Sequence, residues 1–389
     1  MKILVAHNTY QHRGGEDTVV DAEIALLRSR GHEVREYRQH NDAIKQMSPA
    51  AAAVSAIWST QTERDAAAIA REFRPDIIHV HNTFPLISPS LYWAADRMGI
   101  PLVQTLHNFR LLCPQAIFLR DGKICEDCIG KLPWRAVTRK CYRESAVQSA
   151  VVTGMLATHR ALGTYQQRIT RYIALNEFAR AKYVEGGLPA DRIRIKPNFV
   201  ASAGAPEEGE RHGGLYVGRL SGEKGLDVLA AAVQGARLEG IEVIGGGPLE
   251  PLAKAAFGDG YLGYRSLDEI MARMRGASFM VLPSICYENS PRTIVEAFAS
   301  GLPVIASRLG ALVEIVRDGV TGLLFDPGSP DDLAAKMRWA ARHPDEMRRM
   351  GRNARTEYET RYTPDRNYDM LLGIYEDAIS STRNQPHAA

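Results

Sequence analysis

Short apolar runs alternate with amphipathic segments along most of this chain, and that alternation constrains its fold more than any other feature. In the first half, the apolar runs are KILVAHN at 2–8, PDIIHVHN at 75–82 and IPLVQTLHN at 100–108. A helical segment at 17–30, ended by Gly31, follows the first run. Nearly continuous apolar strands joined by crossover helices indicate a parallel sheet with helices on both faces.

The alternation restarts after a change of composition between Pro197 and His212, where proline, glycine, alanine and acids replace the apolar periodicity. We interpret that stretch as an interdomain linker. Beyond it, helical segments cover 226–236, 267–276 and 291–300, and strand-like runs stand between them. The sequence therefore predicts a second doubly wound domain.

A chain of 389 residues is too long for one comfortable hydrophobic core. We predict an α/β protein with two doubly wound, Rossmann-like domains, 1–199 and 212–363, which face a cleft. Residues 364–381 indicate an amphipathic helix that crosses back to the first domain. Its apolar face would carry Tyr368, Leu371, Leu372 and Tyr375. The polar tail at 382–389 is expected to be disordered.

Charge and hydropathy narrow the functional class. Lysine and arginine exceed the acids by only 3, which gives no global attraction to nucleic acid. The first apolar run is too short for a signal peptide, and no stretch approaches the ~18–20 apolar residues that a membrane-spanning helix needs. We therefore expect a cytoplasmic protein.

Two glutamates, Glu288 and Glu296, flank an expected helix start at Pro291. Ser290 is a good N-cap residue, and proline suits the first helical position. Glu288 then lies in the preceding loop and Glu296 lies inside the helix. The free amides at a helix start favour a phosphate, so the two carboxylates could accept hydroxyl hydrogen bonds on either side of a bound diphosphate. Two unrelated surface acids are the simpler interpretation of the pair alone.

Two cations stand at a strand-to-helix turn in the run VGRLSGEKGLDVL. Gly218 and Gly225 permit close approach of the backbone, while Arg219 and Lys224 can neutralise a diphosphate. A basic surface turn is the alternative. The next strand ends at the edge of the sheet where ligands bind in this fold. Three glycines follow it: Gly245, Gly246 and Gly247.

Together these motifs resemble the retaining glycosyltransferases called family 4, whose GT-B architecture joins two Rossmann-like domains. The resemblance covers nearly the whole chain. It rests on ENSPRTIVE, VGRLSGEKG, IGGGPL, EAFASGLPVIAS and a pair of glycines near the start. It implies an enzyme that moves a hexose-type sugar from a nucleotide-diphosphate sugar to an acceptor hydroxyl, in the assembly of cell-surface polysaccharide or lipopolysaccharide.

The resemblance also implies roles for single positions in the donor site. Arg219 and Lys224 match the pair that binds the donor diphosphate and stabilises it as it leaves. Glu288 matches the acid that contacts the hydroxyls of the transferred sugar, and Glu296 matches the acid that holds the ribose. Backbone amides beside the sugar would come from the stretch Ser290 to Arg292, in which Pro291 itself carries no N–H.

On the acceptor side, His107 matches a histidine that faces the reacting sugar. Asn108 stands where the family often has aspartate, so a charge role for that neighbour is in doubt. Gly14 and Gly15 match a loop that lies close to the phosphates. Apart from the resemblance, the candidates for packing on the base are Tyr264 and Arg265.

The implied mechanism is attack on the same face, in which the leaving phosphate helps the acceptor hydroxyl. No metal is required at the donor site, because the cations replace it. A retaining glycosidase would hold its two carboxyl groups ~5 Å apart across one bond, whereas Glu288 and Glu296 suit two ends of a donor. A nucleotide-sugar epimerase of the same fold is an open alternative.

Four of the five cysteines fall in one short stretch, with x11, x2 and x12 spacings. In a reducing compartment that clustering indicates a tetrahedral structural zinc site. Unligated cysteines or a redox pair are the alternatives. The candidate ligands are Cys113, Cys125, Cys128 and Cys141. Cys286, outside the cluster, is expected to be a small buried filler.

The insertion that carries these cysteines, 108–145, is locally basic and contains Trp134 and Tyr142. It could be a zinc-ribbon module for nucleic acid, a solvated insertion, or a surface that docks on an anionic membrane face. The last two are favoured because the insertion directly follows His107. We expect a nucleotide-sugar and a glycan or lipid-linked glycan as partners, and no nucleic acid. Peripheral contact with the inner membrane face stays open.

Overall fold

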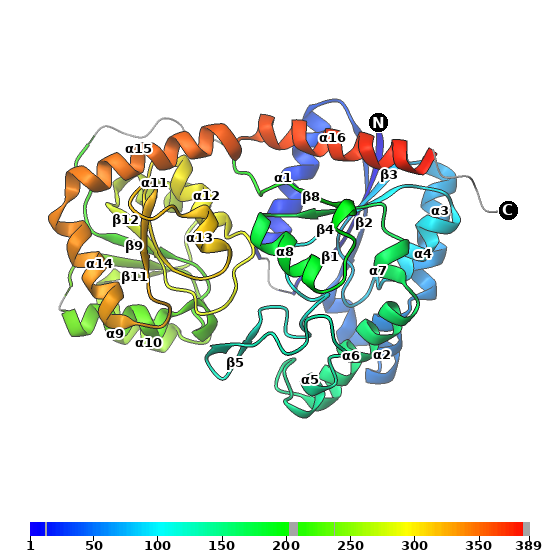
Figure 1. The fold of residues 1–389 in the computed structure, drawn as a ribbon, viewed down its shortest axis with the longest axis horizontal. Coiled ribbons are helices and arrows are strands. Elements are labelled where there is room, and N and C mark those ends of the chain that lie inside the picture. Colours follow the sequence, from blue (N-terminus) through cyan, green and yellow to red (C-terminus); the bar gives the residue numbers. More distant parts are fainter. Residues whose placement is uncertain (12–13, 202–208, 237, 384–389) are drawn as a thin grey trace. The chain divides into compact units, whose positions relative to one another are not determined.

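The computed structural model describes residues 1–11, 14–201, 209–236 and 238–383 (Figure 1). They form two compact units. The first consists of Met1–Ile117, Glu126–Pro197 and Asn367–Ala389, and the second of Phe118–Cys125 and Asn198–Arg366. The centre of the expected linker, 202–208, and most of the expected disordered tail, 384–389, lie outside the described residues.

The first unit is built on a six-stranded sheet in the order β2-β1-β3-β4-β7-β8, in which every pair of neighbours is parallel. Its strands are β1 Lys2–Thr9, β2 Glu33–His40, β3 Ile77–Asn82, β4 Leu102–Thr105, β7 Arg171–Ala174 and β8 Ile193–Ile195. Its helices are α1 Gly15–Ser29, α2 Pro49–Ile57, α3 Thr60–Phe73, α4 Ser90–Arg97, α5 Arg135–Thr138, α6 Ala146–Ala161, α7 Thr164–Gln167 and α8 Glu177–Glu185, with 3-10 turns η1 Asn41–Gln46 and η2 Ala190–Arg192.

The second unit repeats the design with the order β11-β10-β9-β12-β13-β14, again all parallel. Its strands are β9 Gly214–Val217, β10 Ile241–Ile244, β11 Tyr261–Gly263, β12 Phe279–Leu282, β13 Val304–Ser307 and β14 Gly322–Phe325. Its helices are α9 Leu226–Ala236, α10 Glu250–Phe257, α11 Leu267–Gly276, α12 Arg292–Ala299, α13 Ala311–Ile315, α14 Pro330–Arg342 and α15 Pro344–Arg361, with 3-10 turns η3 Gly222–Lys224 and η4 Gly258–Gly260.

Strand order locates the edge at which each sheet can bind a ligand. In the first sheet the direction of winding changes between β1 and β3, and in the second it changes between β9 and β12. The loops that leave the carboxyl ends of strands at such a switch point diverge and create a crevice. The predicted fold class, two doubly wound parallel sheets, is confirmed.

The C-terminal helix α16, Pro364–Arg383, is drawn in red in Figure 1. Its buried face packs into the core of the first unit with Ile3, Val20 and other strand and α1 residues. Arg171 on β7 adds a bidentate pair with Asp377, both contacts at 2.8 Å. The return of this helix to the first unit is confirmed. Its buried apolar residues are Leu371, Ile374, Tyr375 and Ala378, so Ile374 takes the place predicted for Leu372.

A short hairpin interrupts the first unit. It consists of β5, Leu119–Arg120, and β6, Lys123–Ile124, and its residues group with the second unit. There the buried ring of Phe118 meets Tyr287 edge to face, with ring centroids 5.8 Å apart. Part of the predicted insertion therefore packs beside the loop that carries Glu288. Among the helices of the described residues, none combines the length and apolar content needed to span a bilayer.

Candidate functional site

Charged side chains meet at the switch point of the second sheet, where the loops after β9 and β12 leave its carboxyl edge. The ammonium of Lys224 lies 2.6 Å from Oε1 of Glu288. The hydroxyl of Ser284 donates to the same oxygen, also at 2.6 Å. The structure thus brings together two residues that the sequence analysis selected separately and adds Ser284, which that analysis missed.

The turn that carries Lys224 requires glycine at its end. Gly225 has a φ of +69°, and a Cβ there would lie 1.9 Å from the carbonyl oxygen of Pro283. This close approach packs the turn against the end of β12 and holds Lys224 beside Glu288. Lys224 ends the turn η3 and Gly225 caps it, and α9 begins at Leu226, the predicted first residue of that helix.

The glycine run after β10 forms a second close approach. Gly245 has a φ of +140°, and a Cβ there would lie 1.9 Å from the carbonyl oxygen of Gly218. A Cβ on Gly246 would meet the ring of Tyr264 at 2.3 Å, so that ring lies against the loop. Tyr264 is nevertheless 80% exposed. The predicted candidate for base packing is therefore placed at the glycine loop with much of its surface open.

Helix α12 begins one residue later than expected. Pro291 is its N-cap in an extended conformation, and the first helical residue is Arg292. The prediction of Ser290 as the N-cap is therefore wrong, and the Ser290 carbonyl instead accepts from the Asn198 side-chain amide at 3.2 Å. Glu296 lies inside the helix, where Arg292 Nε approaches it at 2.9 Å. Glu288 lies in the loop before it, so the two carboxylates occupy different environments.

Electrostatics distinguish the groups of this cluster. Burial acts to lower the pKa of Lys224, but the Glu288 carboxylate outweighs it and the pKa is raised. Burial raises the pKa of Glu296, and Arg292 opposes that shift. Burial and Glu288 raise the pKa of the Cys286 thiol to about 12, which leaves it protonated near neutral pH. Arg219 is exposed and has no ion-pair partner among the described residues.

At the switch point of the first sheet, Gly14 is the N-cap of α1 and Gly15 is its first residue. The next residue, Glu16, accepts from the Tyr10 hydroxyl at 3.0 Å and from the Asn108 amide at 3.4 Å. Burial raises the pKa of Glu16 to about 7. An aspartate at position 108 would set two carboxylates side by side, which explains why asparagine suits this chain. Glu16 was missed by the sequence analysis, although it adjoins the paired glycines.

His107 follows β4, and its Nε2 lies 2.9 Å from Nδ1 of His81 on β3. His81 in turn lies close to the buried side chains of His79 and Glu23, which the sequence analysis did not single out. The signal was present, because His79 and His81 are two residues apart on one strand and so share a face.

The cysteines do not assemble into a ligand set. None of the five forms a disulfide. Within the described ranges, the only group of three or more potential ligand atoms lying within 4.8 Å of one another consists of Glu23, His79 and His81. The zinc prediction for the four clustered cysteines therefore finds no assembled site here.

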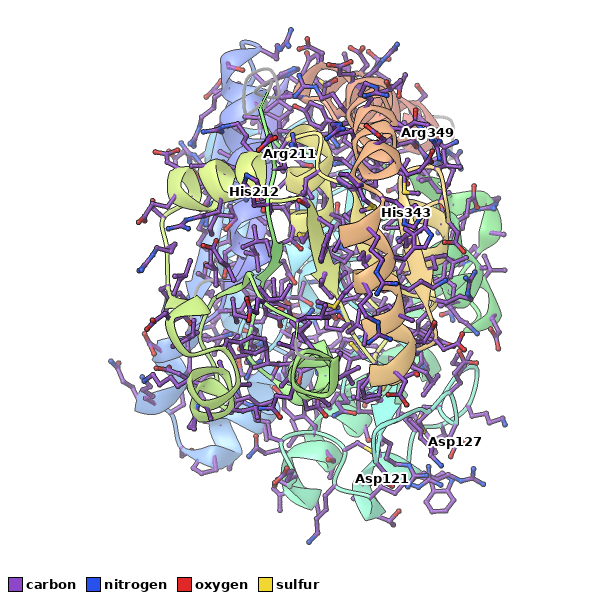
Figure 2. All side chains as sticks on the ribbon, turned by 90° about the vertical axis from the view of Figure 1, so that its left-hand side faces the viewer. Asp121, Asp127, Arg211, His212, His343 and Arg349 are labelled. Atoms are coloured by element: carbon purple, nitrogen blue, oxygen red, sulfur yellow. The ribbon has the colours of Figure 1, made fainter. Side chains whose placement is uncertain are left out.

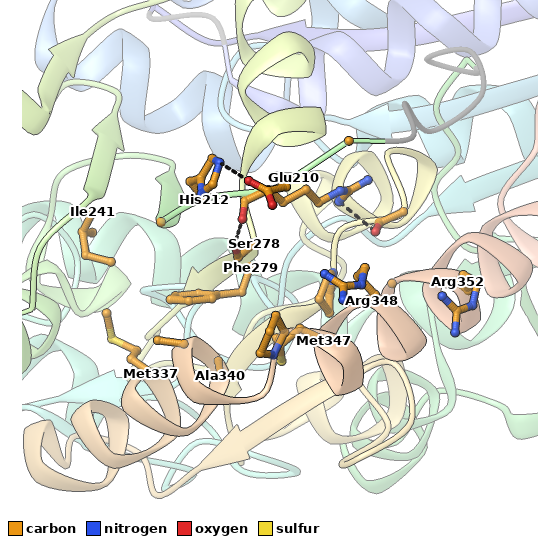
Figure 3. A pocket seen from close by; sticks show the side chains of 18 of the residues that line it. Glu210, His212, Ile241, Ser278, Phe279, Met337, Ala340, Met347, Arg348 and Arg352 are labelled. Atoms are coloured by element: carbon orange, nitrogen blue, oxygen red, sulfur yellow. Dashed lines mark hydrogen bonds and ion pairs between the residues drawn. The ribbon is translucent and has the colours of Figure 1, made fainter.

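A cavity of about 990 Å³ lies elsewhere in the second unit. Figure 3 shows an apolar wall, with Ile241, Phe279 and Met347, and arginines of α15 at its edge. Figure 2 shows Arg211 and His212 on the side of this unit that also carries Arg349 of α15. The cavity borders the first residues of β10 and β12, so it lies at the opposite end of the strands from Lys224 and Glu288.

Two family models match the chain. One, described as glycosyl transferases group 1, covers residues 211–343. The other, described as a glycosyl transferase 4-like domain, covers residues 14–198. The chain therefore contains two glycosyltransferase domains. The group 1 match includes the whole cluster around Glu288, and the 4-like match includes His107 and the paired glycines.

Individual relatives agree with these domain matches. An uncharacterized glycosyltransferase of Methanocaldococcus jannaschii is 31% identical over 51% of this chain and 58% of that protein. Sulfoquinovosyl transferase SQD2 of Arabidopsis thaliana is 27% identical over 82% of this chain and 57% of its own length. The chain spans less than two thirds of both relatives.

Among solved structures, Anabaena HepE in complex with UDP-glucose has a TM-score of 0.67 at 16% identity, covering 97% of this chain and 100% of that one. The two domains of this chain thus have the same GT-B fold as that solved structure.

Proposed function

We propose that the protein transfers a sugar from a nucleotide-diphosphate sugar to an acceptor hydroxyl, with the donor held by the second unit. The observation that carries this proposal is the contact of Lys224 with Glu288, in the loop before α12, at the switch point of a Rossmann-ordered sheet. Anabaena HepE, which shares the fold, was solved with UDP-glucose. A UDP-hexose is therefore the first donor to test.

The chemistry follows from charge. As the bond between the anomeric carbon and the diphosphate oxygen breaks, the diphosphate gains negative charge, which the cations Arg219 and Lys224 and the amides at the start of α12 stabilise. The acceptor oxygen bonds to the same face of the anomeric carbon, and its proton passes to the departing diphosphate. Configuration is then retained. The two cations take the place of a metal at the donor diphosphate.

The two glutamates have separate tasks in this proposal. Glu288, shared between Lys224 and Ser284, retains an oxygen that can accept hydrogen bonds from hydroxyls of the transferred sugar. Glu296 accepts from the ribose hydroxyls, and Tyr264 packs on the base. The first-unit candidates Gly14, Gly15 and His107 are proposed to act on the sugar and the acceptor side.

Thermal-shift titration with UDP, GDP, ADP and their hexose conjugates tests the donor, because a ligand that binds only the folded state raises Tm by mass action. We expect one nucleotide series to stabilise the protein, and Glu296→Ala to abolish that shift while Glu250→Ala preserves it. No shift with any nucleotide would contradict the proposal. Epimerised free donor in the absence of an acceptor would favour the epimerase instead.

A peripheral membrane contact is proposed for the insertion. Leu132 and Trp134 are 58% and 55% exposed, and Lys131 and Arg135 flank them. Apolar side chains beside cations are the features that bind an anionic lipid surface. Such contact would suit a lipid-linked acceptor in polysaccharide assembly. The wild-type protein should pellet with vesicles that contain about 30% anionic lipid, whereas a variant with both Leu132→Ser and Trp134→Ser should stay in the supernatant. Equal pelleting of the two proteins would contradict the contact.

Structural zinc remains a separate proposal, supported only by the spacing of the four cysteines. Metal analysis of the purified chain tests it. About one zinc per chain, lost in the Cys125→Ser and Cys128→Ser variants, would support it, whereas a metal-free folded protein would remove it.

A further inference from the structure

A charged pair is buried inside the first unit. Glu23 of α1 and Lys196, which follows β8, are each 1% exposed, and their charged groups lie 2.7 Å apart. Lys196 also donates to the Asn367 side chain at 3.1 Å. Burial acts to raise the pKa of Glu23, but Lys196 and His79 hold that pKa well below its usual range. Glu23 is therefore an ionised carboxylate in the interior.

The second carboxylate oxygen faces two imidazoles. Oε1 of Glu23 lies 3.0 Å from Nδ1 of His79 and 3.4 Å from Nε2 of His81. Three such groups could ligate a metal ion, but their other contacts oppose it. The Lys196 ammonium already binds the same carboxylate. Both nitrogens of His79 are also engaged, with the Tyr375 hydroxyl at 2.7 Å and the Thr105 hydroxyl at 2.8 Å. We interpret the group as a charge network.

Proton positions in this network follow from electrostatics. Nε2 of His81 and Oε1 of Glu23 are 3.4 Å apart and buried, and neither forms a hydrogen bond among the described residues. An unprotonated Nε2 would still place a lone pair beside the buried carboxylate charge, so the Nε2–H form is favoured. Nδ1 of His81 is then an acceptor. It lies 2.9 Å from Nε2 of His107, which must supply the proton of that hydrogen bond.

Both imidazoles are neutral near pH 7. Burial, with the neighbouring His79, lowers the pKa of His81 to about 3, and burial with His81 lowers the pKa of His107 well below its usual range. A neutral imidazole carries one proton, so His107 protonated on Nε2 has a bare Nδ1. Among the residues that the structure describes, the His107 ring makes one hydrogen bond, through Nε2, and none through Nδ1.

We propose that Glu23 and His81 are positioning residues that hold His107 in the Nε2–H tautomer, so that its Nδ1 accepts a hydrogen bond from a substrate hydroxyl. Outer partners commonly set the tautomer of a histidine in this way. The assignment of the tautomer does not depend on the sugar transfer proposed above. Only the identification of the hydroxyl as part of a sugar donor or acceptor rests on that proposed function. The network selects a substrate that donates at this point.

Nitrogen-15 NMR of the full-length protein labelled on histidine tests the tautomer directly. Signals of His107 are assigned by their loss in His107→Gln. We expect long-range proton couplings to show Nε2 of His107 protonated and Nδ1 bare. A proton on Nδ1 in the wild type would overturn the proposal.

A charge-neutral double variant, Glu23→Gln with Lys196→Met, tests the cause without leaving an unpaired buried charge. It should let both His107 tautomers appear. His79→Gln is the matched control, because His79 also contacts Glu23 but does not contact His107, and it should leave the tautomer unchanged. An unaltered tautomer in the folded double variant would overturn the role of Glu23.

Donor and acceptor analogues with single hydroxyls replaced by fluorine test the substrate contact. At one position we expect kcat/KM to fall about tenfold in the wild type, since fluorine cannot donate, and to fall less in the double variant. If no fluorine substitution gives this pattern and NMR still shows the Nε2–H tautomer, the proposed contact with a substrate hydroxyl is refuted and the tautomer assignment is retained. Failure of the donor function would appear instead as absent nucleotide stabilisation, which leaves the NMR result intact.

Discussion

Each unit contains a lysine–glutamate ion pair, and the two pairs have nearly the same nitrogen–oxygen distance. It is 2.7 Å between Lys196 and Glu23 and 2.6 Å between Lys224 and Glu288. Their surroundings differ. The first pair lies beneath a sheet with each side chain 1% exposed, whereas the Lys224 side chain is 31% exposed in loops beyond the strand ends. A short ion pair therefore says little by itself. Its burial decides whether it holds the fold together or remains available to a ligand.

The largest expected effect is on stability, in the buried pair. Lys196→Met leaves the Glu23 carboxylate buried without its partner and should lower the free energy of unfolding by about 3–5 kcal/mol. Denaturant titration measures this. The double variant with Glu23→Gln should recover most of the loss. Equal losses in the single and double variants would show that the pair contributes through packing and not through charge.

In the open cluster the effect should fall on turnover. Arg219→Ala should reduce kcat by about 10²–10³, since it removes one of the two cations that we propose to stabilise the departing diphosphate. Its free energy of unfolding should stay within about 0.5 kcal/mol of wild type. Arg342→Ala, an exposed arginine on α14, is the control and should leave both unchanged. Near-normal turnover of Arg219→Ala would contradict the proposed role of Arg219 at the donor diphosphate.

Glu16 extends the comparison to pH. Its folded pKa of about 7 exceeds the value near 4.5 of a free side chain. The folded state therefore binds more protons between these values, and stability falls as pH rises from about 4.5 to 7. Glu16→Gln should be more stable than wild type at pH 8, by about 1–3 kcal/mol, and no more stable at pH 4. A constant difference across that range would refute the raised pKa.

The smallest effect is expected at a surface pair. Lys254 and Glu250 lie 2.8 Å apart on α10, one turn from each other, and both are exposed. Lys254→Ala should leave the free energy of unfolding almost unchanged, and any change should be smaller in high salt. A loss of stability comparable to that of Lys196→Met would mean that burial does not determine how much these ion pairs contribute to stability.

Local patterns predicted the elements well. Helices 226–236 and 267–276 form with the predicted bounds, because apolar periodicity, Ser266 capping and nearby glycines act within one element. The start of α12 was missed by one residue, because Pro291 adopts an extended backbone that sequence alone does not reveal. The η3 turn shows the same limit: the conformation of Gly225 is required by its close approach to Pro283, which follows strand β12 and is distant in the sequence.

By itself, the sequence determined the two parallel sheets and the returning C-terminal helix, and it selected the residues that we propose to bind a diphosphate. These follow from side-chain periodicity and from short motifs whose members are neighbours in the chain. Only the tertiary structure decided that Lys224 meets Glu288 across 64 positions, and that Glu23, His81 and His107 form one network. Such contacts depend on strand order, which sets which loops share an edge of the sheet. They also depend on burial, which makes one ion pair structural and leaves the other open to a ligand.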